Sequence, residues 1–168
     1  MKKLSSGGVK ILKIIHLMFA IIWVGGGLSL ALLLFTVSPE ESWGMYAKSY
    51  SLKLIDDYLI IPGAIGCMLT GLIYGIWTNW GFFKHNWITV KWILTVVLVL
   101  FGTFAMGPWV NGNVYNIQDI IKYTTDNSEY YHNISQTKLY GSIQILFLIF
   151  VVVISVIKPW KSKKNKSY

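Results

Sequence analysis

Four long runs without a charged side chain constrain the fold of this sequence more than any other feature. The runs are Ile14–Phe35, Leu59–Trp77, Trp92–Val110 and Leu139–Ile157. A helix of about 20 apolar residues crosses the hydrocarbon core of a bilayer, and it satisfies its own backbone hydrogen bonds there. With 54% hydrophobic and only 13% charged residues, the chain has too little polar surface to cover a soluble globule. The sequence therefore predicts an all-α membrane protein, a bundle of four transmembrane helices.

The predicted organisation is one integral membrane domain over residues 1–168 with a basic tail at 158–168. We expect the helices to cover residues 10–36, 57–79, 87–110 and 137–158. The segment between the first two helices is expected to lie along the membrane interface as a loop, with its tryptophan and tyrosines at headgroup level. The connection TNWGFFKHN is short, so the second and third helices should be antiparallel neighbours.

The charges predict the orientation. All seven acidic residues lie in the connections after the first and third runs, whereas the N-terminal arm, the second connection and the tail carry lysines and no acids. The positive-inside rule then places both termini in the cytoplasm, in a bacterial cytoplasmic membrane. The net charge of +8 is explained by this topology, and no nucleic-acid partner is needed to account for it. The basic tail favours contact with anionic lipid.

A stripe of small residues marks the second run. Gly63, Cys67, Gly71 and Gly75 recur every four residues and share one helix face. Small residues at this spacing let helices approach closely. The stripe predicts close helix packing, within the chain or against a second copy or membrane partner. The other interpretation is a thin groove for a flat ligand.

Two titratable residues lie at one depth, one inside an apolar run and one directly before another. His16 lies near the start of the first run, with Trp23 two turns further on the same face, and Lys91 lies near the start of the third helix. Ionisable groups inside a membrane commonly face the bundle interior and mark function. Two simpler interpretations stay open. Lys91 could extend its amine to the headgroups, and His16 could hydrogen-bond a neighbouring helix.

Haem ligation is the chemistry that this pair favours. A neutral imidazole is a suitable axial ligand, and cations such as Lys13 and Lys91 could pair with haem propionates. His85, in the short connection, could serve as a second ligand only if a helix bends. Copper is the other metal considered, because methionine and Cys67 are soft ligands, but no paired methionine or cysteine motif occurs. No carboxylate lies within the runs, which argues against a carboxylate-driven pump.

Two segments carry a family resemblance. LKIIHLMFAIIWVGGGL resembles the first helix of small membrane proteins related to CopD-type copper-resistance proteins and HemJ-type protoporphyrinogen oxidases. HNWITVKWILTVVLVL is similar to their third helix, with its Trp-x-x-x-Lys step at Trp87 and Lys91. The chain also resembles an uncharacterised family of predicted membrane proteins with four helices. The HemJ-type resemblance implies haem b on the first-helix histidine, His16, and oxidation of a porphyrinogen.

The sequence departs from the HemJ pattern. It has no arginine, and LSLALLLFTV stands where a Pro-Arg step and a later histidine are expected. The leading prediction is therefore haem b, or a related porphyrin, held near the cytoplasmic side by His16, Lys91, Trp23, Lys13 and His85, with enzymatic oxidation left open. The alternative prediction is a non-enzymatic interaction subunit, or a component that moves copper or a small solute.

Overall fold

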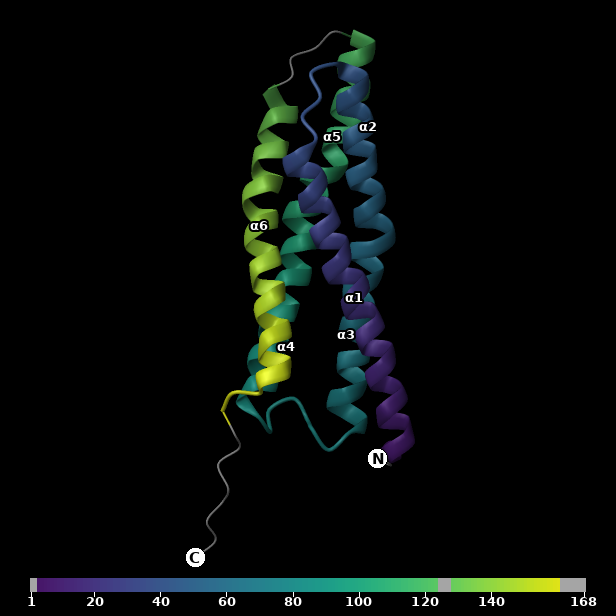
Figure 1. The fold of residues 1–168 in the computed structure, drawn as a ribbon, viewed down its shortest axis with the longest axis vertical. Helices are drawn as coiled ribbons and strands as arrows, with labels where there is room; N and C mark the ends of the chain where they lie inside the picture. The colour runs from purple at the N-terminus through teal and green to yellow at the C-terminus, as the bar shows by residue number, and fades with distance from the viewer. Residues whose placement is uncertain (1–2, 124–127, 161–168) are drawn as a thin grey trace, which may run out of the picture.

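The chain folds into four long antiparallel helical rods (Figure 1). The computed structural model describes residues 3–123 and 128–160, with the backbone alone for 118–123. The first rod is α1 (Ser6–Thr36); the second joins α2 (Ser42–Ile55), the π-helix η1 (Asp56–Ile60) and α3 (Ile61–Trp77); the third joins α4 (Asn86–Phe101), the π-helix η2 (Gly102–Met106) and α5 (Gly107–Tyr123); the fourth is α6 (Ser128–Ile157). All four rods are long and apolar enough to span a membrane, and the described part contains no strand. The predicted fold class is confirmed.

The start of α1 and the end of α6 lie at one end of the bundle, together with the connection 78–85 (Figure 1). We call this the terminal end, and the opposite one the distal end. Of the expected basic tail, residues 161–168 lie outside the described residues.

The rods are longer at the distal end than the apolar runs indicated. The second begins at Ser42 where residue 57 was expected, the third continues to Tyr123 past residue 110, and the fourth begins at Ser128 before residue 137. The expected interfacial loop between the first two helices is thus mostly α2. Its buried residues are Met45, Lys48, Ser49 and Leu52. They follow helical spacing, so an amphipathic face stabilises this helix where no continuous apolar run exists.

A proline follows each π-helical segment. Pro62 lies two residues after η1 and Pro108 two residues after η2. A proline has no N–H to donate, and its ring clashes with the carbonyl four residues earlier. In both rods that carbonyl lies within the wider π turn, which changes the local hydrogen-bond pattern. The rods therefore continue through their prolines as helices.

Packing divides the bundle into two halves. At the distal end α2 packs along α5, and α5 packs along α6; at the terminal end α1 packs along α3, and α4 along α6. Each half has an apolar cluster, one containing Leu34, Leu52 and Ile117, the other Trp23 and Leu148. The predicted neighbours α3 and α4 hardly touch along their backbones. Aromatic side chains from the third rod and the connection fill the space between them, as described below.

Candidate functional site

A hydrogen bond between two rods defines the candidate site. His16 Nδ1 on α1 lies 2.7 Å from Thr70 Oγ1 on α3. His16 is half-buried, and Thr70 is buried with 5% of its surface exposed. Because α1 and α3 run side by side along the terminal half, the histidine points to α3 and not to lipid. The interpretation that His16 hydrogen-bonds a neighbouring helix is therefore correct for its Nδ1 atom.

The hydroxyl of Thr70 determines which ring nitrogen of His16 carries the proton. Thr70 Oγ1 lies 2.6 Å from the carbonyl oxygen of Gly66, one turn earlier. A hydroxyl has one proton, and a carbonyl can only accept. Both short contacts of Thr70 are hydrogen bonds only if the hydroxyl donates its proton to the Gly66 carbonyl and accepts the Nδ1–H of His16. We assign His16 this tautomer, in which Nε2 keeps a free lone pair.

Tyr74 and Cys67 complete the wall around His16 on α3. The Tyr74 ring lies edge-on to the imidazole, with 5.9 Å between the ring centroids and 87° between the planes. The thiol of Cys67 lies 3.9 Å from the carbonyl oxygen of His16, on the backbone side. The imidazole is thus held on two sides by α3, with a hydrogen bond to its Nδ1 and an aromatic ring across its edge.

Lys91 approaches this group from α4. Its amine is close enough to His16 and Cys67 for charge interactions with both. Lys91 is half-buried. Among the side chains of residues 3–117 and 128–160, no carboxylate pairs with it and no acceptor takes a hydrogen bond from it. The site therefore combines an imidazole that donates through Nδ1 with a lysine that has no counter-charge among the described side chains.

The other predicted cofactor residues lie elsewhere. Trp23 is 5% exposed and packs in the apolar cluster of the terminal half, against the backbone of Gly63. Lys13 is exposed on α1. His85 precedes α4 and packs between Trp80 and Trp87, with centroid distances of 6.4 Å and 6.3 Å. In the described part of the chain no ring contact or hydrogen bond joins His85 to His16.

The glycine stripe is occupied by side chains of the same chain. A Cβ on Gly63 would lie 2.7 Å from the backbone nitrogen of Trp23, and one on Gly71 would lie 3.4 Å from the indole of Trp92. A Cβ on Gly75 would overlap the ring of Phe82. Close packing within the chain, the first interpretation of this stripe, thus accounts for all three glycines.

The comparisons with known proteins agree with the fold. A family model described as "predicted integral membrane protein (DUF2269)" matches residues 10–159, which include His16, Thr70 and Lys91. The chain belongs to this family. Searches of curated proteins and of solved structures gave no match. The expected membership of a predicted membrane-protein family is confirmed, whereas the relationship to CopD-type and HemJ-type proteins stays a prediction.

This DUF2269 member has a second polar cluster, further toward the distal end. Lys53 Nζ lies 2.7 Å from Asp57 Oδ2 and 2.7 Å from Asn111 Oδ1 of the third rod. Gly26 of α1 packs against Ile60 of the second rod. Because the two rods are antiparallel, Asp57, which lies three residues before Ile60, is near the depth of Leu30. Leu30 lies within the apolar run of α1. Asp57 is thus a carboxylate outside the four apolar runs that lies level with one of them, paired with a lysine and an amide.

No protein cage for a bare metal ion occurs at either cluster. Across the side chains of residues 3–117 and 128–160, no three His, Cys, Asp or Glu residues gather as metal ligands would. His16 therefore offers a single nitrogen donor, on a ring whose orientation is fixed by its hydrogen bond to Thr70.

Proposed function

We propose that this membrane protein binds haem b, or a related iron tetrapyrrole, at the terminal end of the bundle, with His16 as an axial ligand. The observation that carries this proposal is the hydrogen bond from His16 Nδ1 to Thr70. Histidines that bind a metal commonly donate their other ring N–H to an oxygen acceptor, which fixes the tautomer and the ring orientation. His16 has this arrangement, and its Nε2 is left as the ligating atom.

Lys91 supports the same proposal. Haem b carries two propionate carboxylates, and a cation in a low-dielectric region needs an anionic partner. Lys91 is close enough to His16 for a charge interaction and has no carboxylate partner in the described part. We propose that Lys91 pairs with a propionate. Lys13, exposed on the same face of the membrane in the predicted orientation, could approach the second one.

The donor set fits a haem with one protein ligand. His85 packs between two tryptophans, so the chain offers His16 alone from the pair of predicted axial histidines. Bound haem would supply one-electron redox chemistry. The residues of this chain would hold the cofactor by Nε2, orient the ring through Thr70 and Tyr74, and neutralise a carboxylate through Lys91. We place this site at the cytoplasmic side of a bacterial inner membrane, following the lysine distribution.

Titration of the purified, detergent-solubilised protein with hemin tests the proposal. We expect a Soret band that shifts from its position in free hemin and saturates at one equivalent per binding site. Iron-free protoporphyrin is the matched comparison, since it offers the same carboxylates without a metal for His16, and it should bind at least tenfold more weakly. A hemin spectrum that stays that of free hemin in the same detergent would contradict the proposal.

A non-enzymatic role is the second candidate, and the packing of α1 on α3 favours it. Trp23 fills the space over Gly63, and His16 ties the same two helices together through Thr70. In this role the site is a helix clamp within an interaction subunit or a transport component for copper or a small solute. Metal analysis of the purified protein separates these cases, because copper without iron would favour transport and no metal would favour the clamp.

A further inference from the structure

A lysine joins the end of α6 to the connection 78–85 at the terminal end (Figure 1). The Lys158 amine lies 5.1 Å from the centroid of the Trp80 ring and 6.0 Å from that of Trp87. At such distances a cation is attracted by the negative face of an indole. Trp80 belongs to the connection and Trp87 to the first turn of α4, so Lys158 ties the last rod to both. We call this contact the lysine latch.

The backbone of Lys158 has a conformation that usually belongs to glycine. Lys158 directly follows the last residue of α6, and its φ is 49°, in the left-handed region. Its N–H donates to the carbonyl oxygen of Ile154 at 2.9 Å, one turn earlier. Glycine is the common residue at such a helix end, because a Cβ makes the left-handed conformation costly. The attraction of the Lys158 amine to the two indoles compensates part of this cost.

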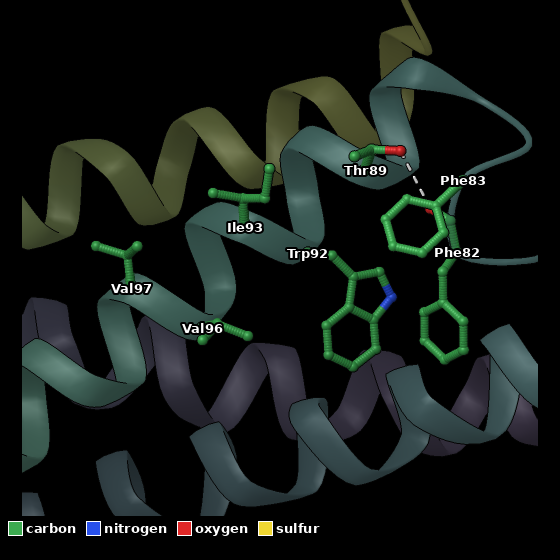
Figure 2. Close-up of a pocket in the computed structure, with 7 residues that line it drawn as sticks. All are labelled: Phe82, Phe83, Thr89, Trp92, Ile93, Val96 and Val97. Carbon is green, nitrogen blue, oxygen red and sulfur yellow. Dashed lines mark hydrogen bonds between the residues drawn. The ribbon is translucent and has the colours of Figure 1, made fainter.

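The indoles of the latch are fixed in place without α6, because the connection is bound to α3 and α4. Figure 2 shows Phe82 beside the Trp92 indole of α4, and the two ring centroids lie 5.2 Å apart. The Thr89 hydroxyl donates to the carbonyl oxygen of Phe82 at 3.1 Å (Figure 2). The Lys3 amine donates to the carbonyl oxygen of Thr78 at 2.9 Å. The part of the latch that is able to move away is therefore the end of α6.

His85 packs against the same two indoles. The centroid of its ring lies 6.4 Å from that of Trp80 and 6.3 Å from that of Trp87, and it is stacked on Trp87 with 29° between the planes. The two indoles meet each other edge to face at 5.5 Å. In the described part of the chain no hydrogen bond holds either ring nitrogen of His85. The imidazole is therefore free to take up a proton where it lies.

The charged residues of the elements around His85 are all lysines: Lys158 of α6, Lys84 of the connection, Lys91 of α4 and Lys3 of the N-terminal arm. Residues 1–13, 78–92 and 158–168 contain no aspartate or glutamate, and Ile61–Trp77 contains no charged residue. A proton on His85 would therefore place a second cation on the two indoles that hold Lys158. Like charges repel, and these segments offer no carboxylate side chain to neutralise the new one.

We propose that the lysine latch is a pH-dependent contact, closed while His85 is neutral and open once His85 is protonated. Histidine is the side chain that ordinarily gains its charge between about pH 8 and about pH 5. The imidazolium would interact with the Trp87 face as a cation in its own right and would repel Lys158. Release of Lys158 frees the end of α6 from the connection, while α3 and α4 keep their places. The proposal stands apart from haem binding, since the latch uses neither His16 nor Lys91.

Nuclear magnetic resonance of methylated lysines tests the proposal on the full-length protein in detergent. Reductive methylation with isotope-labelled formaldehyde marks exposed lysines such as Lys158 and keeps their charge. Methyl groups over the face of an indole resonate upfield, so at about pH 8 one lysine signal should lie upfield of the others. This signal should be absent in Lys158→Gly, a change that suits the left-handed backbone. In Trp80→Leu the signal should return to the position of exposed lysines.

Acidification separates a pH-dependent latch from a permanent contact. Between about pH 8 and about pH 5 the upfield signal of the unmodified chain should move to the position of exposed lysines. His85→Gln cannot gain a charge and should keep the signal upfield throughout, whereas His132→Gln, at an exposed histidine of α6, should behave like the unmodified chain. Circular dichroism checks that each variant is folded. An absent upfield signal, one that does not move with pH, or one that moves equally in His85→Gln would each overturn the proposal.

Discussion

His16 of α1 and Thr70 of α3 are joined through Nδ1 and Oγ1 at 2.7 Å, and the Thr70 hydroxyl in turn reaches the Gly66 carbonyl. This relay gives the imidazole a fixed tautomer at a depth where few polar partners exist. In this tautomer the second ring nitrogen, Nε2, keeps its lone pair. The relay is therefore the feature from which the proposed axial ligation follows.

Thr70→Val should weaken hemin binding while the bundle stays folded. The change keeps the shape of the side chain and removes the acceptor for His16 Nδ1–H, and loss of such a partner typically costs 10–100-fold in metal affinity. We expect a loss of about tenfold in a hemin titration followed at the Soret band. Thr95→Val is the matched control, since Thr95 is also buried but lies on α4 and makes no bond to His16. An equal loss in both variants would argue against the relay.

Lys91→Gln should weaken the binding of hemin and leave that of hemin dimethyl ester unchanged. The ester has no propionate charge for Lys91 to pair with. A hydrogen bond between charged groups contributes about 1.5–3 kcal/mol, so a loss of at least tenfold is expected for hemin itself. Lys91→Arg should retain most of the affinity. If both ligands lose affinity equally in Lys91→Gln, Lys91 acts on the fold and not on the carboxylate.

Gly63→Ala should destabilise the bundle, and Gly25→Ala should not. A Cβ on Gly63 would press into the Trp23 backbone at 2.7 Å, whereas one on Gly25 meets no atom within 4 Å. Overpacking of this kind costs about 1–3 kcal/mol, and alanine in an open helical position stabilises by up to about 1 kcal/mol. Thermal unfolding in detergent, followed by circular dichroism, should show a lower midpoint for Gly63→Ala alone. Equal midpoints would show that α1 and α3 are not in this contact.

Lys48→Met should loosen the distal end of α1. The Lys48 amine is buried and donates to the carbonyl oxygens of Val37 at 2.6 Å and Leu34 at 3.4 Å, where α1 ends. Without it these carbonyls lose their donor, at a cost of about 1–3 kcal/mol. Hydrogen exchange should become faster over residues 33–40. Lys10→Met removes an exposed lysine and should leave exchange there unchanged; faster exchange in both variants would exclude a specific role for Lys48.

The sequence predicted the fold because charge-free runs of this length have one stable solution in a bilayer. It did not predict the distal helical extensions, since α2 is stabilised by buried side chains such as Met45 and Leu52 and not by an apolar run. The glycine stripe predicted close packing, and the structure identifies Trp23, Trp92 and Phe82 as the side chains that occupy it.

The candidate site was predicted in part. His16, within an apolar run, and Lys91, directly before another, are recognisable from sequence, and the structure places them within charge-interaction distance. Thr70 and Tyr74 were missed, because a threonine and a tyrosine are ordinary in such a run and only the register of α1 against α3 brings them to His16. That register is fixed by the contact of Trp23 with Gly63. The same contact explains why Trp23 belongs to the core and not to the site.

The most direct test of the account compares hemin binding to His16→Ala and His85→Ala. We predict that His16→Ala, folded as judged by circular dichroism, loses the shifted Soret band of the unmodified protein and recovers it when free imidazole is added. His85→Ala should keep the band, because His85 packs against tryptophans away from His16. A Soret band in His16→Ala identical to that of the unmodified protein would contradict axial ligation by His16.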